Sequence, residues 1–306
     1  YGSELIALKK TIVARGYHEL QTWSFISTSH AHDFGGELEA LTLINPISAE
    51  LCHMRTSLLP NILVAMQKNL HRGVDAQAFF EVDTQFRGIK PDEQDLAFAG
   101  VCVGALVPKD WNHQSPTTAN VFTAKADLWE LLKEWGMEPD RLLLSQNVPS
   151  YYHPQRSGAL HLGPKVVVGY FGELHPRIAA QFDLKKRVAI FELNISKLPS
   201  AKKPAPKDYK PSDYQSVQRD FAFVVEQSVK ASALLQTIAK VDKNLIRDVQ
   251  LFDVYQGEKV VQGHKSLAIR IEIQADDRTL TDQELQDLSS AVIKAVHDQH
   301  KGQLRQ

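Results

Sequence analysis

Lys265-Ser266-Leu267-Ala268-Ile269-Arg270-Ile271-Glu272-Ile273 is the stretch that decides the fold of the second half of the chain. From Leu267 onward every second residue is a large aliphatic one, and the residues between them are small or charged. Alternation with a period of two is typical of a β-strand that is buried on one face only. The stretch therefore predicts a sheet with one covered face and one open face, and it places Arg270 on the open face.

The segments on either side of this strand complete a familiar order of elements. Thr281 with Glu284 forms a capping box, which predicts the start of a helix. The expected elements are a strand at 219–226, a helix at 234–241, strands at 246–255 and 265–273, a helix from 282 and a short strand at 302–305. The order β-α-β-β-α-β predicts a ferredoxin-like domain with both helices on one face of the sheet.

The first part of the chain mixes helices and strands without regular βαβ spacing. Ala97–Val103 is apolar on both faces, so we expect it to be a central strand in a sheet that is covered on both sides. The other expected elements are helices at 5–16, 57–71, 122–135 and 178–182 and strands at 20–26, 79–86, 166–173 and 188–195. Together they predict an α+β fold, a sheet with flanking helices.

The domain boundaries follow from length and local composition. The chain has 306 residues, which suits two domains better than one. The segment 198–211 is rich in Pro, Lys and Ala and has no apolar periodicity, so it predicts an extended linker. We therefore expect a first domain at 1–197, the linker at 198–211 and a second domain at 212–306. The chain opens Tyr1-Gly2-Ser3 without a Met, as an excised fragment would.

Composition and the absence of common motifs exclude several functional classes. The chain has 35 Lys and Arg against 36 Asp and Glu, which excludes a globally basic nucleic-acid binder. Its two cysteines do not suggest a disulfide scaffold, and they fit a reducing, cytoplasmic setting. We expect no membrane partner, since the longest apolar run, 96–107, is too short to span a bilayer. No phosphate-binding loop, dinucleotide fingerprint, H-E-x-x-H or C-x-x-C motif is present, so neither a catalytic nor a metal-binding residue is assigned.

Several motifs, taken in their order along the chain, resemble one family. In the second part they are RDFAFVV at 219–225, LFDVYQG at 251–257, KSLA at 265–268, RTLTD at 278–282 and QLR at 303–305. In the first part they are NPIS at 45–48, MRTSLLP at 54–60, FEV at 80–82 and GELHP at 172–176. The ordered set resembles the C-terminal part of the β subunits of bacterial phenylalanyl-tRNA synthetases, a catalytic-like domain followed by a ferredoxin-fold anticodon-binding domain.

The resemblance implies a fold and an absence of catalysis. The first domain would be a relative of the class II synthetase core, an antiparallel sheet with flanking helices. A working core needs an Arg followed two residues later by an acid, but here Arg87 is followed by Ile89. The nearest match to the third class II motif, 172–177, contains Glu173 and Pro176, which do not suit a phosphate site. This chain would therefore bind no cofactor itself, and ATP and Mg²⁺ would be used by the holoenzyme.

The resemblance also implies partners, namely a catalytic α subunit in an α2β2 heterotetramer and a tRNA, but no DNA. The stretch RGYHEL at 15–20 is similar to the first class II motif, a helix and strand used for dimerisation, so the segment 5–25 is expected to form part of an interface. We therefore expect an interface at Ile12, Tyr17, Trp23 and Phe25. Basic residues on the open sheet face or in loops of the second domain are the candidates for tRNA contact: Arg270, Lys243, Arg247, Lys259, Lys265 and Arg305. We expect no paired aromatic residues for base stacking on this face.

Two other functions remain open from the sequence. One is an independent class II-like ligase that uses ATP to activate a small acid. The other is a free-standing ferredoxin-like module that binds RNA. The missing acid after Arg87 counts against the first alternative, and the long first domain counts against the second.

Overall fold

The computed structural model describes residues 2–35, 39–107, 109–201, 212–257 and 260–305. The chain divides into two compact units, Tyr1–Pro206 and Lys207–Gln306, and each unit is described by itself. Their boundary falls within the predicted linker 198–211, most of which lies outside the described residues. None of the helices in the described ranges combines the length and the apolar composition needed to cross a bilayer.

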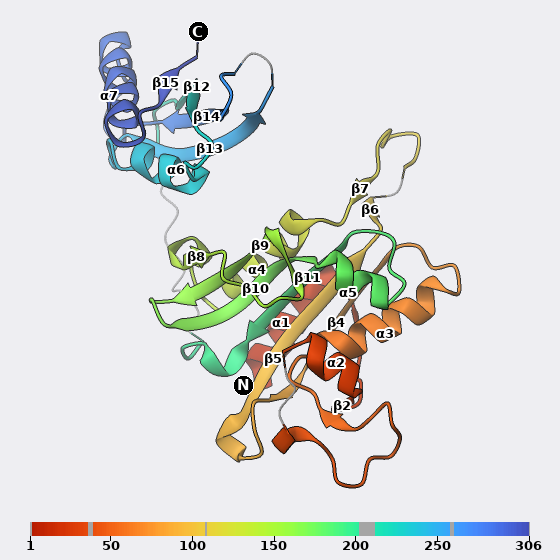
Figure 1. The fold of residues 1–306 in the computed structure, drawn as a ribbon. Coiled ribbons are helices and arrows are strands. Elements are labelled where there is room, and N and C mark those ends of the chain that lie inside the picture. The colour runs from red at the N-terminus through yellow and green to blue at the C-terminus, as the bar shows by residue number, and fades with distance from the viewer. Residues whose placement is uncertain (1, 36–38, 108, 202–211, 258–259, 306) are drawn as a thin grey trace. The chain divides into compact units, whose positions relative to one another are not determined.

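A seven-stranded sheet organises the first unit, with the order β1-β4-β5-β11-β10-β9-β8 (Figure 1). Its strands are β1 (His18–Glu19), β4 (Gln77–Phe86), β5 (Gln94–Val103), β8 (Leu143–Ser145), β9 (Tyr152–Leu162), β10 (Val166–Leu174) and β11 (Val188–Asn194). β1 pairs with β4 in parallel, and the other neighbours are antiparallel. The predicted antiparallel sheet is thus confirmed, with a parallel pair at one edge.

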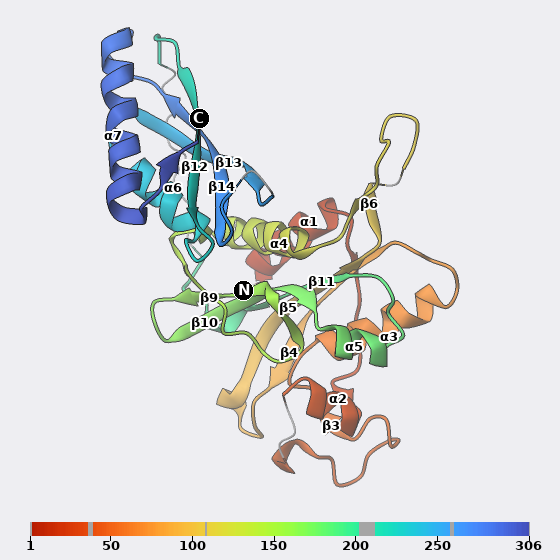
Figure 2. The same cartoon turned by 45° about the horizontal axis from the view of Figure 1, so that its top comes forward.

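Helices cover both faces of this sheet (Figure 2). α1 (Gly2–Ala14) and α4 (Val121–Glu134) pack on one face, and α3 (Leu59–Leu70) and α5 (Pro176–Gln181) pack on the other. β5 contributes to both cores, since Phe98 and Cys102 belong to the first and Ala99 and Val101 to the second. The prediction of a central strand covered on both sides is therefore confirmed.

The first unit also contains several shorter strands and helices outside the main sheet. Two small two-stranded sheets pair β2 (Phe25–Ile26) with β3 (His53–Met54) and β6 (Ala105–Val107) with β7 (Thr117–Thr118). The remaining short helices are α2 (Thr28–Asp33), η1 (Glu39–Leu41), η2 (Pro91–Glu93), η3 (Pro139–Arg141) and η4 (Ile195–Lys197). β9 was not predicted, because it contains Pro154 and Gly158 and few β-branched residues. Gly158 leaves the space that the Phe171 ring fills, and a Cβ there would lie 2.8 Å from that ring.

The second unit has the predicted ferredoxin-like fold, with the strand order β13-β14-β12-β15. Its elements are β12 (Val217–Glu226), α6 (Ala231–Ala239), β13 (Ile246–Tyr255), β14 (His264–Ile273), α7 (Asp282–His300) and β15 (Gln303–Leu304). The capping box is confirmed, since Thr281 Oγ1 accepts from the amide of Glu284 and the Glu284 carboxylate accepts from the amide of Thr281. Alternate residues of β12 and β14 form one core with both helices, and no helix among the described residues packs on the other sheet face.

Candidate functional sites: a buried arginine and an open sheet face

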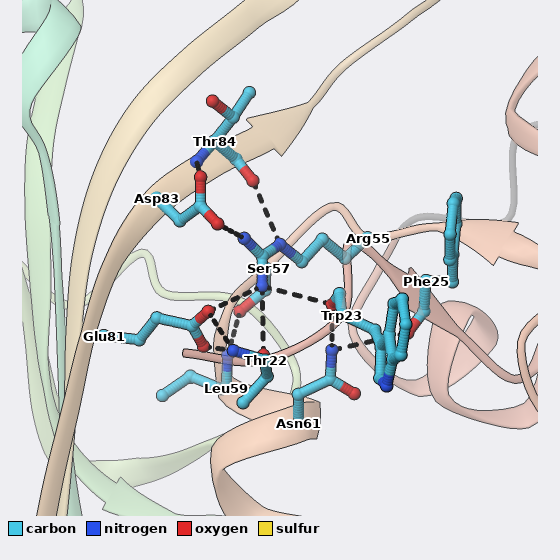
Figure 3. A network of polar contacts seen from close by, with 10 residues as sticks. All are labelled: Thr22, Trp23, Phe25, Arg55, Ser57, Leu59, Asn61, Glu81, Asp83 and Thr84. Carbon is cyan, nitrogen blue, oxygen red and sulfur yellow. Dashed lines mark hydrogen bonds and ion pairs between the residues drawn. The ribbon is translucent and has the colours of Figure 1, made fainter. Parts of the chain in front are cut away.

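Arg55 lies at the centre of a buried polar network between β3 and the start of α3 (Figure 3). Its side chain is fully buried, and it forms ion pairs with Glu81 at 3.0 Å and with Asp83 at 2.6 Å, both on β4. Its Nε also donates to the backbone carbonyl of Thr84 at 3.0 Å. Because buried charges are tolerated only when they are paired and hydrogen-bonded, these contacts fix the guanidinium in one position.

The same guanidinium holds the segment that leads into β2. Arg55 donates to the Thr22 hydroxyl at 3.1 Å and to the Trp23 carbonyl at 3.3 Å, and Glu81 accepts from the amide and hydroxyl of Thr22. Asn61 of α3 donates to the same Trp23 carbonyl at 2.6 Å. These side chains satisfy backbone groups that a strand would have paired. The predicted strand 20–26 is therefore wrong, and only Phe25–Ile26 is a strand within it.

The structure separates the four predicted interface residues into two groups. Trp23 is 66% exposed, and Phe25 is half-buried, so both present apolar surface. Ile12 is fully buried in the core, and Tyr17 is buried with its hydroxyl donating to Asp127 at 2.6 Å. Ile12 and Tyr17 pack within this unit, so of the four residues Trp23 and Phe25 are the ones with surface that a partner could contact.

More exposed apolar side chains lie on the chain that follows β2. Ile44 is 95% exposed and Ile47 is 73% exposed. Their loop is tied to the small β2–β3 sheet, because the amide of Leu43 donates to the carbonyl of Cys52 and the amide of Cys52 donates to that of Ile26. We refer to Trp23, Ile44 and Ile47 as the apolar set. Exposed aliphatic and aromatic side chains held on fixed backbone are typical of the centre of protein interfaces.

The residues nearest to class II catalytic groups are occupied by ion pairs. Arg87 forms two hydrogen bonds with Asp95, at 2.7 and 3.2 Å, and Ile89 points into solvent with 72% exposure. Glu173 is buried and pairs with Arg156 at 2.7 Å. Arg87 therefore already has a carboxylate partner, and the third-motif candidate presents a buried acid.

A small cavity of about 190 Å³ next to Arg87 is lined in part by Tyr151, Tyr170 and Glu192. The Glu192 carboxylate accepts from Ser57 at 2.6 Å, Tyr151 at 2.9 Å and Tyr152 at 3.1 Å. Burial raises the pKa of this carboxyl, and the three hydroxyl donors oppose that shift. Glu192 is thus held by protein donors as part of the core. In the part of the chain that the structure covers, no three His, Cys, Asp or Glu residues are grouped so as to hold a metal ion.

On the open face of the second unit, two arginines lie over two aromatic rings. The Arg270 guanidinium is 5.2 Å from the centre of the Phe252 ring, and the Arg305 guanidinium is 5.1 Å from that of Tyr255. Phe252 is 50% exposed. We expected this face to lack paired aromatic residues, but it carries two aromatic rings, each covered by an arginine. The register shift between Leu251 and Asp253 places Tyr255 opposite Ser266, on the same face as Arg270.

Arg270 also has a carboxylate partner that strand parity alone could not identify. Arg270 binds Asp220, its direct neighbour on β12, through two hydrogen bonds of 2.8 Å. Hydrogen bonding to Arg270 lowers the pKa of Asp220. The counter-charge of Arg270 is thus supplied by the neighbouring strand β12.

The other predicted tRNA-contacting residues lie apart from this pair of stacked arginines. Lys243 is exposed after α6, and Arg247 pairs with Asp276 and donates to the Gln274 carbonyl at 3.1 Å. Lys265 donates to the Gln227 carbonyl at 3.0 Å, and Lys259 lies outside the described residues. Of the predicted set, Arg270 and Arg305 are thus brought to one face together with aromatic rings. The LFDVYQG motif was the available signal for Phe252 and Tyr255.

Comparisons with known proteins match both units. A family model described as the phenylalanyl tRNA synthetase beta chain CLM domain matches residues 5–195, and one described as a ferredoxin-fold anticodon binding domain matches residues 212–305. The phenylalanine–tRNA ligase β subunit of Rhodospirillum rubrum is 39% identical over 304 residues, which cover 98% of this chain and 38% of the relative. That of Paramagnetospirillum magneticum is 40% identical over 302 residues, covering 97% and 38%.

This chain thus spans about 38% of the length of these curated relatives. Among solved structures, a pyrrolysyl tRNA synthetase from Desulfitobacterium hafniense is similar with a TM-score of 0.47 and 14% sequence identity. The similarity covers 63% of this chain and 65% of that one.

Proposed function

The chain belongs to the phenylalanyl-tRNA synthetase β-chain family, and we propose that it serves phenylalanine–tRNA ligase as a docking scaffold for the catalytic α subunit and as a contact for tRNA. The observation that carries the proposal is the match of both units, in order, to β subunits that are 39–40% identical over nearly the whole chain. The complete enzyme would be an α2β2 heterotetramer in the cytoplasm that uses ATP and Mg²⁺ to attach phenylalanine to its tRNA.

Catalysis would reside in the α subunit. Formation of an aminoacyl adenylate develops negative charge around a phosphorus atom, which needs free arginines and metal ions nearby. Arg87 is instead paired with Asp95. The first unit would therefore keep the shape of a synthetase core without its reaction, and ATP and Mg²⁺ would bind elsewhere in the holoenzyme.

A pyrophosphate-exchange assay separates this proposal from an independent ATP-dependent ligase. We expect the purified chain to show no phenylalanine-dependent exchange of pyrophosphate into ATP. Turnover that persists after every trace of α subunit has been removed would contradict the scaffold role and support the ligase alternative.

The apolar set is the candidate docking surface for the α subunit. Trp23 is exposed although its backbone is fixed by the buried Arg55 and by Asn61, so little flexibility is lost on binding. Replacing Trp23 by Asp in the full β subunit should prevent assembly with α while leaving the fold intact, as measured by size-exclusion chromatography and circular dichroism. Trp111→Asp is the matched control, because Trp111 is 88% exposed and lies outside the apolar set. Normal assembly of the folded Trp23 variant would exclude this surface.

The open sheet face of the second unit is the candidate tRNA contact. Exposed aromatic rings can stack on unpaired bases, and arginines can bind phosphates or stack on bases themselves. Phe252 with Arg270 and Tyr255 with Arg305 provide both groups on one face. A free-standing RNA-binding module would offer the same face. Co-purification of the full β subunit with α, through the first unit, is the result that distinguishes the two.

A further inference from the structure

A charged cleft of about 370 Å³ lies in the first unit, where α5 is followed by the chain that enters β11. Its charged lining residues are Arg156, Glu173, Asp183, Lys185, Lys186 and Arg187. The other lining residues with described placement are aliphatic, and none is aromatic. The cleft therefore offers charge but no ring on which a base could stack.

Four of the six charged residues that line this cleft are basic, and the buried acid Glu173 is already paired, so the lining keeps a positive excess. Glu173 is only 2% exposed and pairs with Arg156 at 2.7 Å, while Asp183 pairs with His71 outside the cleft lining at 3.2 Å. Lys186 is held by Asp75 at 3.2 Å. Lys185 and Arg187 form no ion pair with any residue that the structure describes, so their charges are available to an anion.

His153 lies close to the same basic side chains. Burial is the main cause of the lowered pKa of His153, and the positive charges of Arg156 and Arg187 lower it further, against the opposing effect of Glu173.

The cationic segment is held at both ends. Asp183 adopts the left-handed conformation, with φ 52°, and its amide donates to the Ala180 carbonyl while that of Leu184 donates to Ala179. These bonds end α5 in a closed turn. Val188 then pairs with Val103 of the central strand β5. Residues 185–187 are thus presented on fixed backbone, which lowers the entropic cost of binding.

We propose that this cleft binds a backbone phosphate of the tRNA, as a contact on the first unit in addition to the sheet face of the second. The inference rests on the proposed function. The exposed Lys185 and Arg187, with the half-buried Arg156 beside them, match the charge of a phosphodiester, and they can bind its oxygens through charge-assisted hydrogen bonds. The aliphatic lining favours the sugar–phosphate backbone over a nucleotide, whose base would have no stacking partner.

The test compares two charge-matched double variants of the 306-residue chain in tRNA titrations across a salt series. Lys185→Gln with Arg187→Gln removes the available charges of the cleft. Lys133→Gln with Arg141→Gln is the control, because it removes the same charge from exposed residues that are paired with Glu130 and Glu138. The cleft variant should weaken tRNA binding and reduce the magnitude of the slope of log K against log salt by roughly 0.7–0.9, the value for one lost phosphate contact. The control should match wild type.

Each other outcome overturns the inference in a distinguishable way. If the cleft variant binds tRNA like the control while Arg270→Ala weakens binding, the cleft proposal fails and the proposed function stands. If the wild-type chain does not bind tRNA at all, both fail. If calorimetry detects inorganic phosphate in the cleft of wild type but tRNA binding is unchanged in the variant, the cleft is a free-anion site. If the variant loses assembly with α but keeps tRNA binding, the cleft serves a protein interface instead.

Discussion

Arg55 in the first unit and Arg270 in the second each bind a carboxylate, but in opposite surroundings. The side chains of Arg55 and its partner Glu81 are at most 1% exposed. Those of Arg270 and Asp220 are 43% and 47% exposed. Water screens the exposed pair and cannot reach the buried one. The same residue type therefore holds the backbone together in one unit and remains available to a ligand in the other.

This difference has a functional meaning under the proposal. Arg55 forms ion pairs with Glu81 and Asp83 and donates a hydrogen bond to the Trp23 carbonyl, so that the docking surface is rigid before a partner arrives. Arg270 gives two hydrogen bonds to Asp220 and still lies over an exposed ring. A phosphate could compete for the exposed Arg270 at low cost, whereas the Arg55 guanidinium is fully buried and out of reach of such a ligand.

The largest expected effect is the loss of Arg55. Arg55→Met leaves Glu81 buried without a counter-charge, and removing one partner of a buried ion pair costs about 3–5 kcal/mol. We expect urea unfolding of the 306-residue chain to show the transition of the first unit at lower denaturant. Arg270→Met, the matched change in the exposed pair, should leave both transitions where they are. If both variants lowered the unfolding midpoint by the same amount, the buried and exposed ion pairs would not differ in their contribution to stability.

The next largest effect on stability is expected from a substitution on the covered face of β14. Ile269 is 1% exposed on the covered face of β14, next to Arg270 on the open face. Ile269→Ala removes buried methyl groups and leaves a cavity, which should lower the free energy of unfolding of the second unit by about 2–5 kcal/mol. Arg270→Ala is the control one residue away. Wild-type stability in the Ile269 variant would mean that the face assignment is wrong.

Strand parity and capping predicted the second unit almost completely, because its sheet is covered on one face and its sequence alternates accordingly. They failed where side chains replace backbone pairing, as at Thr22 and Trp23, and where the strand β9 carries Pro154 and Gly158. The site was predicted less well. Arg270 was placed on the correct face, but its partner Asp220 depends on the register between two strands 50 residues apart, which no local pattern specifies.

A smaller effect, confined to a pH range, is expected at Glu192. Its pKa is raised in the folded state, so the folded protein holds the proton more tightly than the unfolded chain does. Its contribution to stability is therefore complete below the ordinary value of 4.5 and is lost as the pH rises through the folded pKa. The wild type should therefore lose free energy of unfolding as the pH rises above 4.5, and Glu192→Gln should remove this loss. The difference in stability between wild type and variant should then change with pH above 4.5. Parallel pH profiles for the two proteins would show that the carboxyl does not titrate in this range.

The smallest effect on stability, and the one that tests the exposed arginine directly, is that of Arg270→Ala. The second unit is slightly acidic, so tRNA binding there must rely on a local patch that neutralises few phosphates. With two or three phosphate contacts the salt slope should have a magnitude of about 2–3, from roughly 0.9 per phosphate on a duplex and less on single strands. Arg270→Ala should lower tRNA affinity and reduce this slope without moving the unfolding transition, because the Arg270 side chain lies outside the core.

Asp220→Asn changes the other member of the same ion pair. It frees Arg270 from a competing carboxylate, and we expect it to strengthen tRNA binding, measured by titration of labelled tRNA across a salt series. A slope near ten, or wild-type affinity in both variants, would place the tRNA contact on another surface.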